Sequence, residues 1–383
     1  MPNKLRVALF SPYLPSLDSA AFPRKVYDYI RLLSCRGHLI YLFSFCSQDD
    51  REKIDKISPF CKSLKLEFLK DYSRYPHTCR AFKQEIASLC KNEDIDIIQC
   101  EQSYMNRYIP KYIRAPRILV EHEILSESFL QKAVLKNNFF HKIILYSRSI
   151  KKYLEEKRWY AKFNAIVVFS NQDRNIIRTR YGRENIKIIP LGIDLNAYQT
   201  KHITNTRYDL LCVGNFLHSP NVDAILYFCK KILPLVKKNL PSVSLVITGC
   251  NPAESIIRLA KENTNITVSG YIENLAGTYS EAKIFIAPIR YGTGMRYKII
   301  EAMALGVPVV STSVGARGFH PDELKIADNP KEFANAVVEL LKNPDECNRM
   351  AKKGRAAVEQ YYSWDKLLDQ YEAIYDDLAM KPK

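Results

Sequence analysis

The sequence of 383 residues lacks the features of a membrane-spanning or secreted protein. No apolar run approaches the roughly 18 residues that a membrane-spanning helix requires. The apolar run VALF at residues 7–10 is too short for the core of a signal peptide. We therefore expect a cytoplasmic protein.

Disulfide and metal-site patterns are also missing. The ten cysteines are scattered, with no CxxC pair and no spacing typical of a metal site. The Asp-x-Asp pair, Asp94 and Asp96, leads into the apolar run IIQC and is interpreted as the start of a strand. The sequence therefore predicts reduced, buried thiols and no bound metal.

Acidic residues are fewer than basic ones. The chain has 41 Asp and Glu against 57 Lys and Arg, which gives a formal net charge of +16. This balance favours anionic partners such as nucleic acid, an acidic membrane face or a phosphorylated substrate. The cations are dispersed and form no recognisable nucleic-acid-binding motif, so we expect no nucleic-acid partner.

Strand-like and helix-like segments alternate along the chain, and the series restarts near residue 208. The strand candidates of the first half are residues 6–12, 39–45, 95–101, 117–123, 165–170 and 186–192. Those of the second half are residues 208–216, 244–249, 266–271, 283–288 and 307–312. Helical spacing separates them, for example at 25–37 and 221–238. The pattern predicts an α/β protein with two doubly wound, Rossmann-like domains facing each other across a cleft, at 1–198 and 199–361. The polar residues 196–207 form the expected linker.

Residues 283–312, KIFIAPIRYGTGMRYKIIEAMALGVPVVST, are the most informative segment. We expect a strand, a glycine-containing loop, and a helix that ends at Gly306, with Pro308 preventing its continuation. In a parallel sheet such a loop lies at the carboxyl edge, where doubly wound folds bind ligands. Glycines allow close approach of the backbone, and a helix start offers N–H groups that suit phosphate.

Helical spacing adds geometry to this segment. Gly294, Lys298 and Glu301 fall on one helix face, with Arg296 nearby in the first turn. Two cations and a helix amino terminus can hold a diphosphate, and the carboxylate can accept hydrogen bonds from ribose hydroxyls. The alternative is structural: Lys298 and Glu301 form a surface ion pair, and the glycines only allow a turn.

At these residues a family resemblance becomes visible. Residues 283–318 resemble the donor-binding segment of retaining glycosyltransferases of family four, the group 1 glycosyltransferases, in the subset with a GTGxRxK pattern. Further segments resemble this family in the same order along the chain, at 167–177, 188–198, 213–228, 270–288 and 362–371. The resemblance is strong from about residue 165 to 371. It implies the two-domain GT-B fold, with a terminal helix at about 362–379 packing back on the first domain.

The resemblance also implies roles for individual residues. Arg296 and Lys298 would bind the donor diphosphate and stabilise the leaving group, and Glu301 would bind the ribose. His122 would touch the transferred sugar; its alternative role is that of a satisfied core imidazole at a strand end. The remaining implied donor contacts are Gly292, Thr293, Gly294 and Met295 at the phosphates or sugar, Gly214 and Asn215 at the phosphates, and Tyr271 and Ile272 beside the base.

Two departures from the family pattern keep a non-catalytic interpretation open. Many members have a glutamate eight positions before the one matched by Glu301, where this chain has Thr293. Many also have paired glycines in the amino-terminal loop, where this chain has Ser19, Ala20 and Ala21. A protein that only binds a nucleotide sugar or a partner is therefore an alternative, as is an epimerase acting on a nucleotide sugar.

The function that the resemblance implies is metal-independent, retaining transfer of a hexose. The donor would be a nucleotide-diphosphate sugar, UDP- or GDP-linked, and no cofactor is expected. The acceptor would be a saccharide or a lipid-linked glycan in the synthesis of cell-surface polysaccharide or glycoconjugates.

Residues 127–163 mix cations with Phe, Leu, Tyr and Trp159. One interpretation is a helix pair that rests on an anionic membrane at the inner face of the plasma membrane and meets lipid-linked sugars. The other is an ordinary solvated helix pair whose apolar face packs on the first domain.

Overall fold

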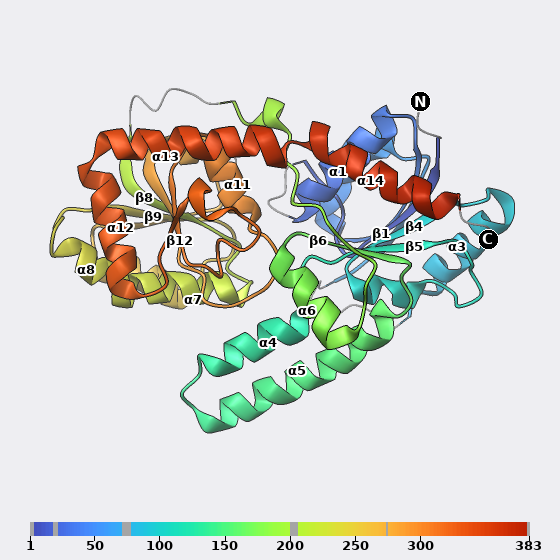
Figure 1. The fold of residues 1–383 in the computed structure, drawn as a ribbon, viewed down its shortest axis with the longest axis horizontal. Coiled ribbons are helices and arrows are strands. Elements are labelled where there is room, and N and C mark those ends of the chain that lie inside the picture. The colour runs from blue at the N-terminus through green and yellow to red at the C-terminus, as the bar shows by residue number, and fades with distance from the viewer. Residues whose placement is uncertain (1–3, 18–21, 71–77, 200–205, 273–274, 381–383) are drawn as a thin grey trace. The chain divides into compact units, whose positions relative to one another are not determined.

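The computed structural model describes residues 4–17, 22–70, 78–199, 206–272 and 275–380. The chain forms two compact units (Figure 1). The N-terminal unit comprises Met1–Gly192 together with Trp364–Lys383, and the C-terminal unit comprises Ile193–Ser363. The boundary therefore lies six residues before the expected residue 198. Residues 193–198 belong with the second unit, because Ile193 pairs with Ser363 and Tyr198 bonds to Glu301.

The N-terminal unit is built on a seven-stranded parallel sheet of order β3-β2-β1-β4-β5-β6-β7. Its strands are β1 (Arg6–Ser11), β2 (Leu39–Cys46), β3 (Ser63–Phe68), β4 (Ile97–Glu101), β5 (Arg117–Val120), β6 (Ala165–Val168) and β7 (Ile186–Ile188). The six expected strands are confirmed, whereas β3 was not predicted. This edge strand carries Lys65 and Glu67 and buries no residue fully, so its apolar signal is weak.

Helices connect these strands. They are α1 (Phe22–Cys35), α2 (Arg51–Ile57), α3 (Arg80–Asn92), α4 (Leu125–Val134), α5 (Phe139–Tyr160) and α6 (Asn171–Tyr181), followed at the chain end by α14 (Trp364–Ala379). Among the described residues, none of the helices combines the length and the apolar character needed to cross a membrane.

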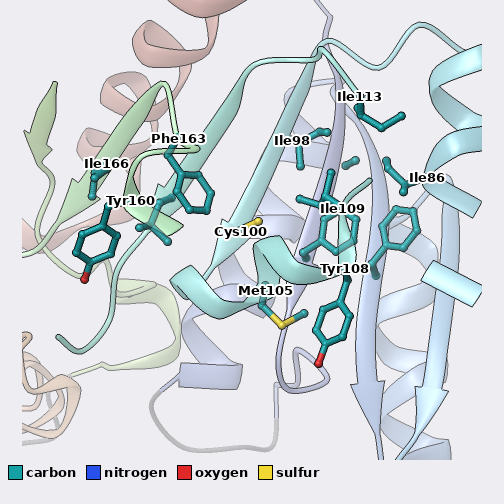
Figure 2. Close-up of a cluster of buried hydrophobic side chains, with 14 of the residues drawn as sticks. Ile86, Ile98, Cys100, Met105, Tyr108, Ile109, Ile113, Tyr160, Phe163 and Ile166 are labelled. Carbon is teal, nitrogen blue, oxygen red and sulfur yellow. The ribbon is translucent and has the colours of Figure 1, made fainter. Parts of the chain in front are cut away.

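One hydrophobic core of the N-terminal unit lies between its sheet and the helices of one face. Figure 2 shows Ile98 and Cys100 of β4 near Tyr108 and Ile109, with Tyr160 and Phe163 further along the same layer. Alternate residues of each strand point into this layer, because side chains of a strand alternate between its two faces.

Helix α14 packs on α1 within the N-terminal unit. The Tyr29 and Tyr375 hydroxyls are 2.5 Å apart, and both lie within hydrogen-bonding distance of the Gln99 amide oxygen. Trp364 lies so close to Gly192 that a Cβ there would come within 2.4 Å of the indole. The end of the chain is thus an integral part of this unit.

The C-terminal unit has a six-stranded parallel sheet of order β10-β9-β8-β11-β12-β13. Its strands are β8 (Tyr208–Val213), β9 (Leu245–Thr248), β10 (Ile266–Gly270), β11 (Ala282–Ala287), β12 (Val309–Ser311) and β13 (Lys325–Ile326). The five expected strands are confirmed. The unpredicted β13 has two residues, which is too short for any periodic pattern to detect.

The helices of this unit are α7 (Ser219–Tyr227), α8 (Leu233–Lys237), α9 (Glu254–Glu262), α10 (Leu275–Ser280), α11 (Tyr297–Ala304), α12 (Pro330–Lys342) and α13 (Pro344–Ala357). The single helix expected at 221–238 is interrupted by a π-helical turn, Phe228–Ile232. Pro234 lacks an N–H and cannot continue the regular ladder, which explains the local widening. Two doubly wound parallel sheets, as the sequence predicted, make up the protein.

Candidate functional site

The centre of the second sheet brings two predicted segments together. Strands β8 and β11 are neighbours, and Leu211 pairs with Phe285. The strand order runs outward in opposite directions from this pair, so the carboxyl ends of β8 and β11 mark the topological switch point of the sheet. Gly214 and Asn215 follow β8, and the loop of Gly292 and Gly294 follows β11. Both segments thus lie at the edge of the sheet where ligands of doubly wound folds bind.

The loop after β11 requires its glycines. Gly292 and Gly294 have φ angles of 113° and 75°, which favour glycine. A Cβ on Gly292 would lie 2.7 Å from the Arg296 guanidinium, so the missing side chain also makes room for that cation. Arg296 donates from Nη1 to the Thr293 carbonyl at 3.0 Å. Thr293 and Met295 are buried within the loop.

Helix α11 begins at Tyr297, two residues after the start at Met295 that the sequence indicates. Arg296 was predicted within the first turn, but it is the N-cap residue, with extended φ and ψ of −101° and 102°. Its side chain therefore folds back over the loop instead of projecting from the helix. The helix ends as predicted: its last residue is Ala304, and Gly306 follows with a φ of 73°.

Lys298 turns from α11 toward the end of β8. Its ammonium donates to the Val213 carbonyl at 3.0 Å and to Asn221 Oδ1 at 2.7 Å. Burial lowers the pKa of Lys298 to about 8. No carboxylate of the described residues forms an ion pair with Lys298, so two neutral oxygens are its partners. A desolvated ammonium held in this way attracts an anion strongly.

Asn221 links Lys298 to the segment after β8. Its Nδ2 donates to the Asn215 carbonyl at 2.8 Å, while its Oδ1 accepts from Lys298. The Asn215 side chain in turn accepts from the Leu217 backbone N–H at 3.0 Å. Gly214 packs against the Asn221 side chain, where a Cβ would come within 3.1 Å of it.

A nearby arginine has a structural role. Arg290 makes a bidentate ion pair with Asp223, at 2.8 and 2.6 Å, and stacks over the Tyr227 ring. These contacts fix the start of the glycine loop against α7. Arg290 is therefore engaged within the protein.

The carboxylate of Glu301 is buried and bonded to tyrosines. The Tyr198 hydroxyl donates to Oε1 at 2.8 Å, and the Tyr279 hydroxyl lies 3.3 Å from Oε2. The surface Lys298–Glu301 ion pair, which was the structural alternative, is not formed. Each carboxylate oxygen can accept a second hydrogen bond, so the predicted ribose contact stays a prediction.

The residues expected beside the base lie at the edge of the C-terminal unit. Tyr271 is 63% exposed directly after β10. Ile272 borders a hollow that Thr267 and Thr278 also line. This hollow includes no residue of the glycine loop, so it is separate from the diphosphate candidates.

In the N-terminal unit, His122 follows β5 and belongs to a buried polar network. Its Nε2 lies 2.6 Å from Glu101 Oε2, and the same carboxylate pairs with Lys25 at 3.2 Å. The Gln99 amide donates to the other oxygen of Glu101 at 2.6 Å. Phe22 and Phe169 pack against the imidazole, with ring centroids 4.1 and 5.1 Å away.

This network fixes the protonation of His122. Burial raises the pKa of Glu101, but Lys25, His122 and Gln99 outweigh it and bring the pKa to about 2. Burial and the Lys25 charge lower the pKa of His122 to about 4. At neutral pH a neutral imidazole therefore donates from Nε2 to an ionised carboxylate, and Nδ1 is the acceptor. The predicted residues Ser19, Ala20 and Ala21 lie outside the described residues.

Comparison with known proteins assigns the chain to a family. Residues 207–343 match the family described as "Glycosyl transferases group 1", and residues 24–197 match "Glycosyltransferase Family 4". Together these two matches cover more than half of the chain. The chain belongs to the group 1 glycosyltransferases.

Individual relatives and solved structures are similar to this group 1 glycosyltransferase. The MMP alpha-(1->4)-mannosyltransferase of Mycolicibacterium hassiacum is 27% identical over 210 residues, which cover 50% of this chain and 48% of the relative. The chain thus spans about half the length of the curated relatives that it matches. Among solved structures, sucrose-phosphate synthase of Thermosynechococcus elongatus superposes with a TM-score of 0.77 at 19% identity, covering 98% of this chain and 99% of the other. Anabaena HepE in complex with UDP and glucose superposes with a TM-score of 0.65 at 14% identity, covering 97% and 100%. These likenesses show the GT-B fold.

Several side chains that hold the site of this glycosyltransferase were not singled out from the sequence. Asn221 could have been found, because it follows Ser219 and Pro220 at a helix start directly after the Gly214 segment. Tyr198 and Tyr279 carry no local signal, since their contacts with Glu301 span 103 and 22 residues. Glu101 stands at the end of a buried strand, where an acidic residue is itself a signal of a paired or functional group.

Proposed function

We propose that this group 1 glycosyltransferase transfers a hexose from a nucleotide-diphosphate sugar to a saccharide or lipid-linked acceptor, with retention of configuration. The observation that carries the proposal is Lys298. This partly buried ammonium has only neutral oxygens as partners at the switch point of the C-terminal sheet, beside Arg296 and the glycine loop.

The charges of the site support binding of a diphosphate. The Arg296 guanidinium folds over the Gly292 loop, and the Lys298 ammonium lies at the end of β8, so both cations lie at the carboxyl edge of the sheet. Backbone N–H groups at the start of α11 add to the positive field. These groups stabilise the charge that develops on a leaving diphosphate.

The proposed reaction requires little from the protein besides this charge. An acceptor hydroxyl attacks the anomeric carbon on the face from which the diphosphate departs. The bond from the anomeric carbon to the phosphate oxygen breaks, the new glycosidic bond forms, and the hydroxyl proton passes to the departing diphosphate. Same-face attack retains the anomeric configuration.

His122 is proposed to contact the transferred sugar, a role that rests on the family resemblance. Its neutral imidazole, oriented by Glu101, offers Nδ1 as an acceptor for a sugar hydroxyl. A UDP- or GDP-linked donor is proposed because one structure of similar fold is a complex with UDP and glucose, and one relative, from Corynebacterium glutamicum, is named a GDP-mannose-dependent mannosyltransferase.

The test is calorimetric titration of UDP, GDP, ADP and CMP, followed by donor turnover. We expect one nucleoside diphosphate to bind at micromolar strength and its sugar conjugate to be hydrolysed slowly without an acceptor. NMR of the product anomer then reports retention. Binding of a nucleotide sugar with no hydrolysis or transfer to any acceptor would favour a non-catalytic protein, and binding of no nucleotide would overturn the proposal.

A further inference from the structure

Helices α4 and α5 form a hairpin that has one buried face. Figure 1 shows the two helices side by side, with their connecting loop at the end remote from the sheet of the N-terminal unit. Helix α5 buries Leu145, Ser149, Glu156 and Tyr160. The Ser149 hydroxyl donates to the Ser126 carbonyl of α4, and Glu156 accepts from Tyr181 of α6. These contacts anchor the hairpin to the unit.

A second apolar face of α5 remains exposed. Phe139, Ile143, Tyr146, Ile150 and Leu154 follow each other at intervals of four, three, four and four residues, so they form one stripe along the helix. Their exposed fractions run from 40% for Tyr146 to 69% for Phe139.

The stripe continues into the turn of the hairpin. Val134, at the end of α4, is 65% exposed, and Phe140, beside the start of the stripe, is 74% exposed. The sequence also allowed an ordinary solvated helix pair whose one apolar face packs on the first domain. That face exists, but it is not the one that carries the stripe. A contiguous exposed apolar surface of this kind marks an interaction site.

The hairpin is also basic over its outer part. Between Glu127 and Glu155 the sequence contains no acidic residue. The same stretch contains six cations: Lys132, Lys136, Lys142, Arg148, Lys151 and Lys152. An occupant of this surface must therefore be apolar and anionic at once, along a helix of about 33 Å.

We propose that the α4–α5 hairpin docks on an anionic lipid bilayer, with α5 lying in the plane of the interface. The stripe and the exposed Phe140 enter the boundary between headgroups and acyl chains, and the flanking cations contact acidic headgroups. An anionic bilayer satisfies both requirements over the whole length of the helix. This inference does not rest on sugar transfer, because it depends only on the hairpin.

Co-sedimentation of the full chain with vesicles tests the proposal. We expect binding to vesicles of phosphatidylglycerol and phosphatidylcholine, weak binding to phosphatidylcholine alone, and weakening by salt. Replacing both rings, Phe139→Asp with Phe140→Asp, should reduce binding by about tenfold or more, because two large apolar side chains no longer enter the bilayer.

Phe68→Asp is the matched control. Phe68 is an exposed phenylalanine of the same unit, 58% exposed at the end of β3, and its replacement should leave vesicle binding unchanged. Nucleotide binding should be the same in all these variants, which separates a failure of docking from a failure of the proposed function.

Fluorescence locates the contact. The only native tryptophans are Trp159 and Trp364, both outside the turn of the hairpin, so Phe140→Trp adds a reporter there. We expect a blue shift with anionic vesicles and quenching by brominated acyl chains. No vesicle binding by the wild type would overturn the proposal. A second result would also overturn it: the wild type is a dimer in sedimentation velocity, the double Asp variant is a monomer, and vesicles have no effect on either. A second copy of the chain would then cover the stripe.

Discussion

Two lysines, Lys25 buried in the N-terminal unit and Lys298 partly buried in the C-terminal unit, are stabilised in opposite ways. Lys25 of α1 is 1% exposed and pairs with the fully buried Glu101 at 3.2 Å. Lys298 of α11 donates to the Val213 carbonyl and Asn221 Oδ1, and no carboxylate of the described chain pairs with it. Burial lowers the pKa of both ammonium groups.

The difference shows which cation is structural and which is available to a ligand. The charge of Lys25 is neutralised inside the protein, and three aromatic rings, of Tyr29, Phe169 and Tyr371, surround its ammonium. Lys298 hydrogen-bonds only to neutral oxygens, and the Glu301 carboxylate acts on it without direct contact. A ligand that brings negative charge to Lys298 therefore gains an interaction that the protein alone does not provide.

The largest expected effect comes from breaking the ion pair between Lys25 and Glu101. Lys25→Met leaves the Glu101 carboxylate buried without its cation, so the free energy of unfolding should fall by about 3–5 kcal/mol. Urea denaturation followed by circular dichroism measures this loss. Adding Glu101→Gln removes the orphaned charge and should restore part of the stability. A loss below about 1 kcal/mol for Lys25→Met would show that the pair contributes little.

Lys298→Ala should weaken nucleotide binding strongly and change stability little, which is the reverse of what we expect for Lys25→Met. The affinity for the preferred nucleoside diphosphate should fall about 10- to 100-fold, since one charge-assisted contact of about 1.5–3 kcal/mol is lost. The free energy of unfolding should change by only about 1 kcal/mol, because losing two hydrogen bonds is offset by removing a desolvated charge.

Lys283→Ala is the control for this variant. Lys283 lies at the amino end of β11, on the edge of the sheet opposite the glycine loop, and pairs with Asp209 at 2.8 Å. Its removal should leave nucleotide affinity unchanged in calorimetry. An unchanged dissociation constant in a folded Lys298→Ala protein would remove Lys298 from the site.

The two lysines also show which features of the protein could be predicted from the sequence. Alternating strand and helix patterns located eleven strands, and the glycine loop pointed to Lys298. The partners of Lys298, however, lie 85 and 77 residues away, and no local pattern encodes them. The Lys25–Glu101 pair spans 76 residues in the same way. Local periodicity predicts elements, whereas the neutralisation of a buried charge depends on contacts between distant segments.

The pH dependence of binding should reveal the unpaired cation directly. Burial lowers the pKa of Lys298 to about 8, and a bound diphosphate raises that pKa again. Binding therefore takes up a proton above pH 8, and affinity should fall about 5- to 10-fold between pH 7.5 and pH 9. Lys298→Arg keeps its charge throughout, so any residual binding by that variant should lack this fall in calorimetric titrations. An equal fall in Lys298→Arg would assign the titration to another group.

The smallest expected effect tests why Lys298 stays unpaired. Glu301 lies one helical turn away, but its carboxylate accepts hydrogen bonds from Tyr198 at 2.8 Å and Tyr279 at 3.3 Å. Tyr198→Phe removes the shorter bond and should lower the free energy of unfolding by about 0.5–1.5 kcal/mol. The released oxygen can then turn toward Lys298, which would make this lysine resemble Lys25.

The nucleotide affinity of Tyr198→Phe should consequently weaken, but by less than that of Lys298→Ala. The fall of this affinity with rising pH should begin above pH 8, because a carboxylate partner raises the pKa of an ammonium. Tyr279→Phe, which loses the longer bond, should show a smaller change in the same titrations. If Tyr198→Phe binds the nucleotide as tightly as the wild type and with the same pH profile, then the tyrosines do not hold Glu301 away from Lys298, and the rigidity of α11 must do so instead.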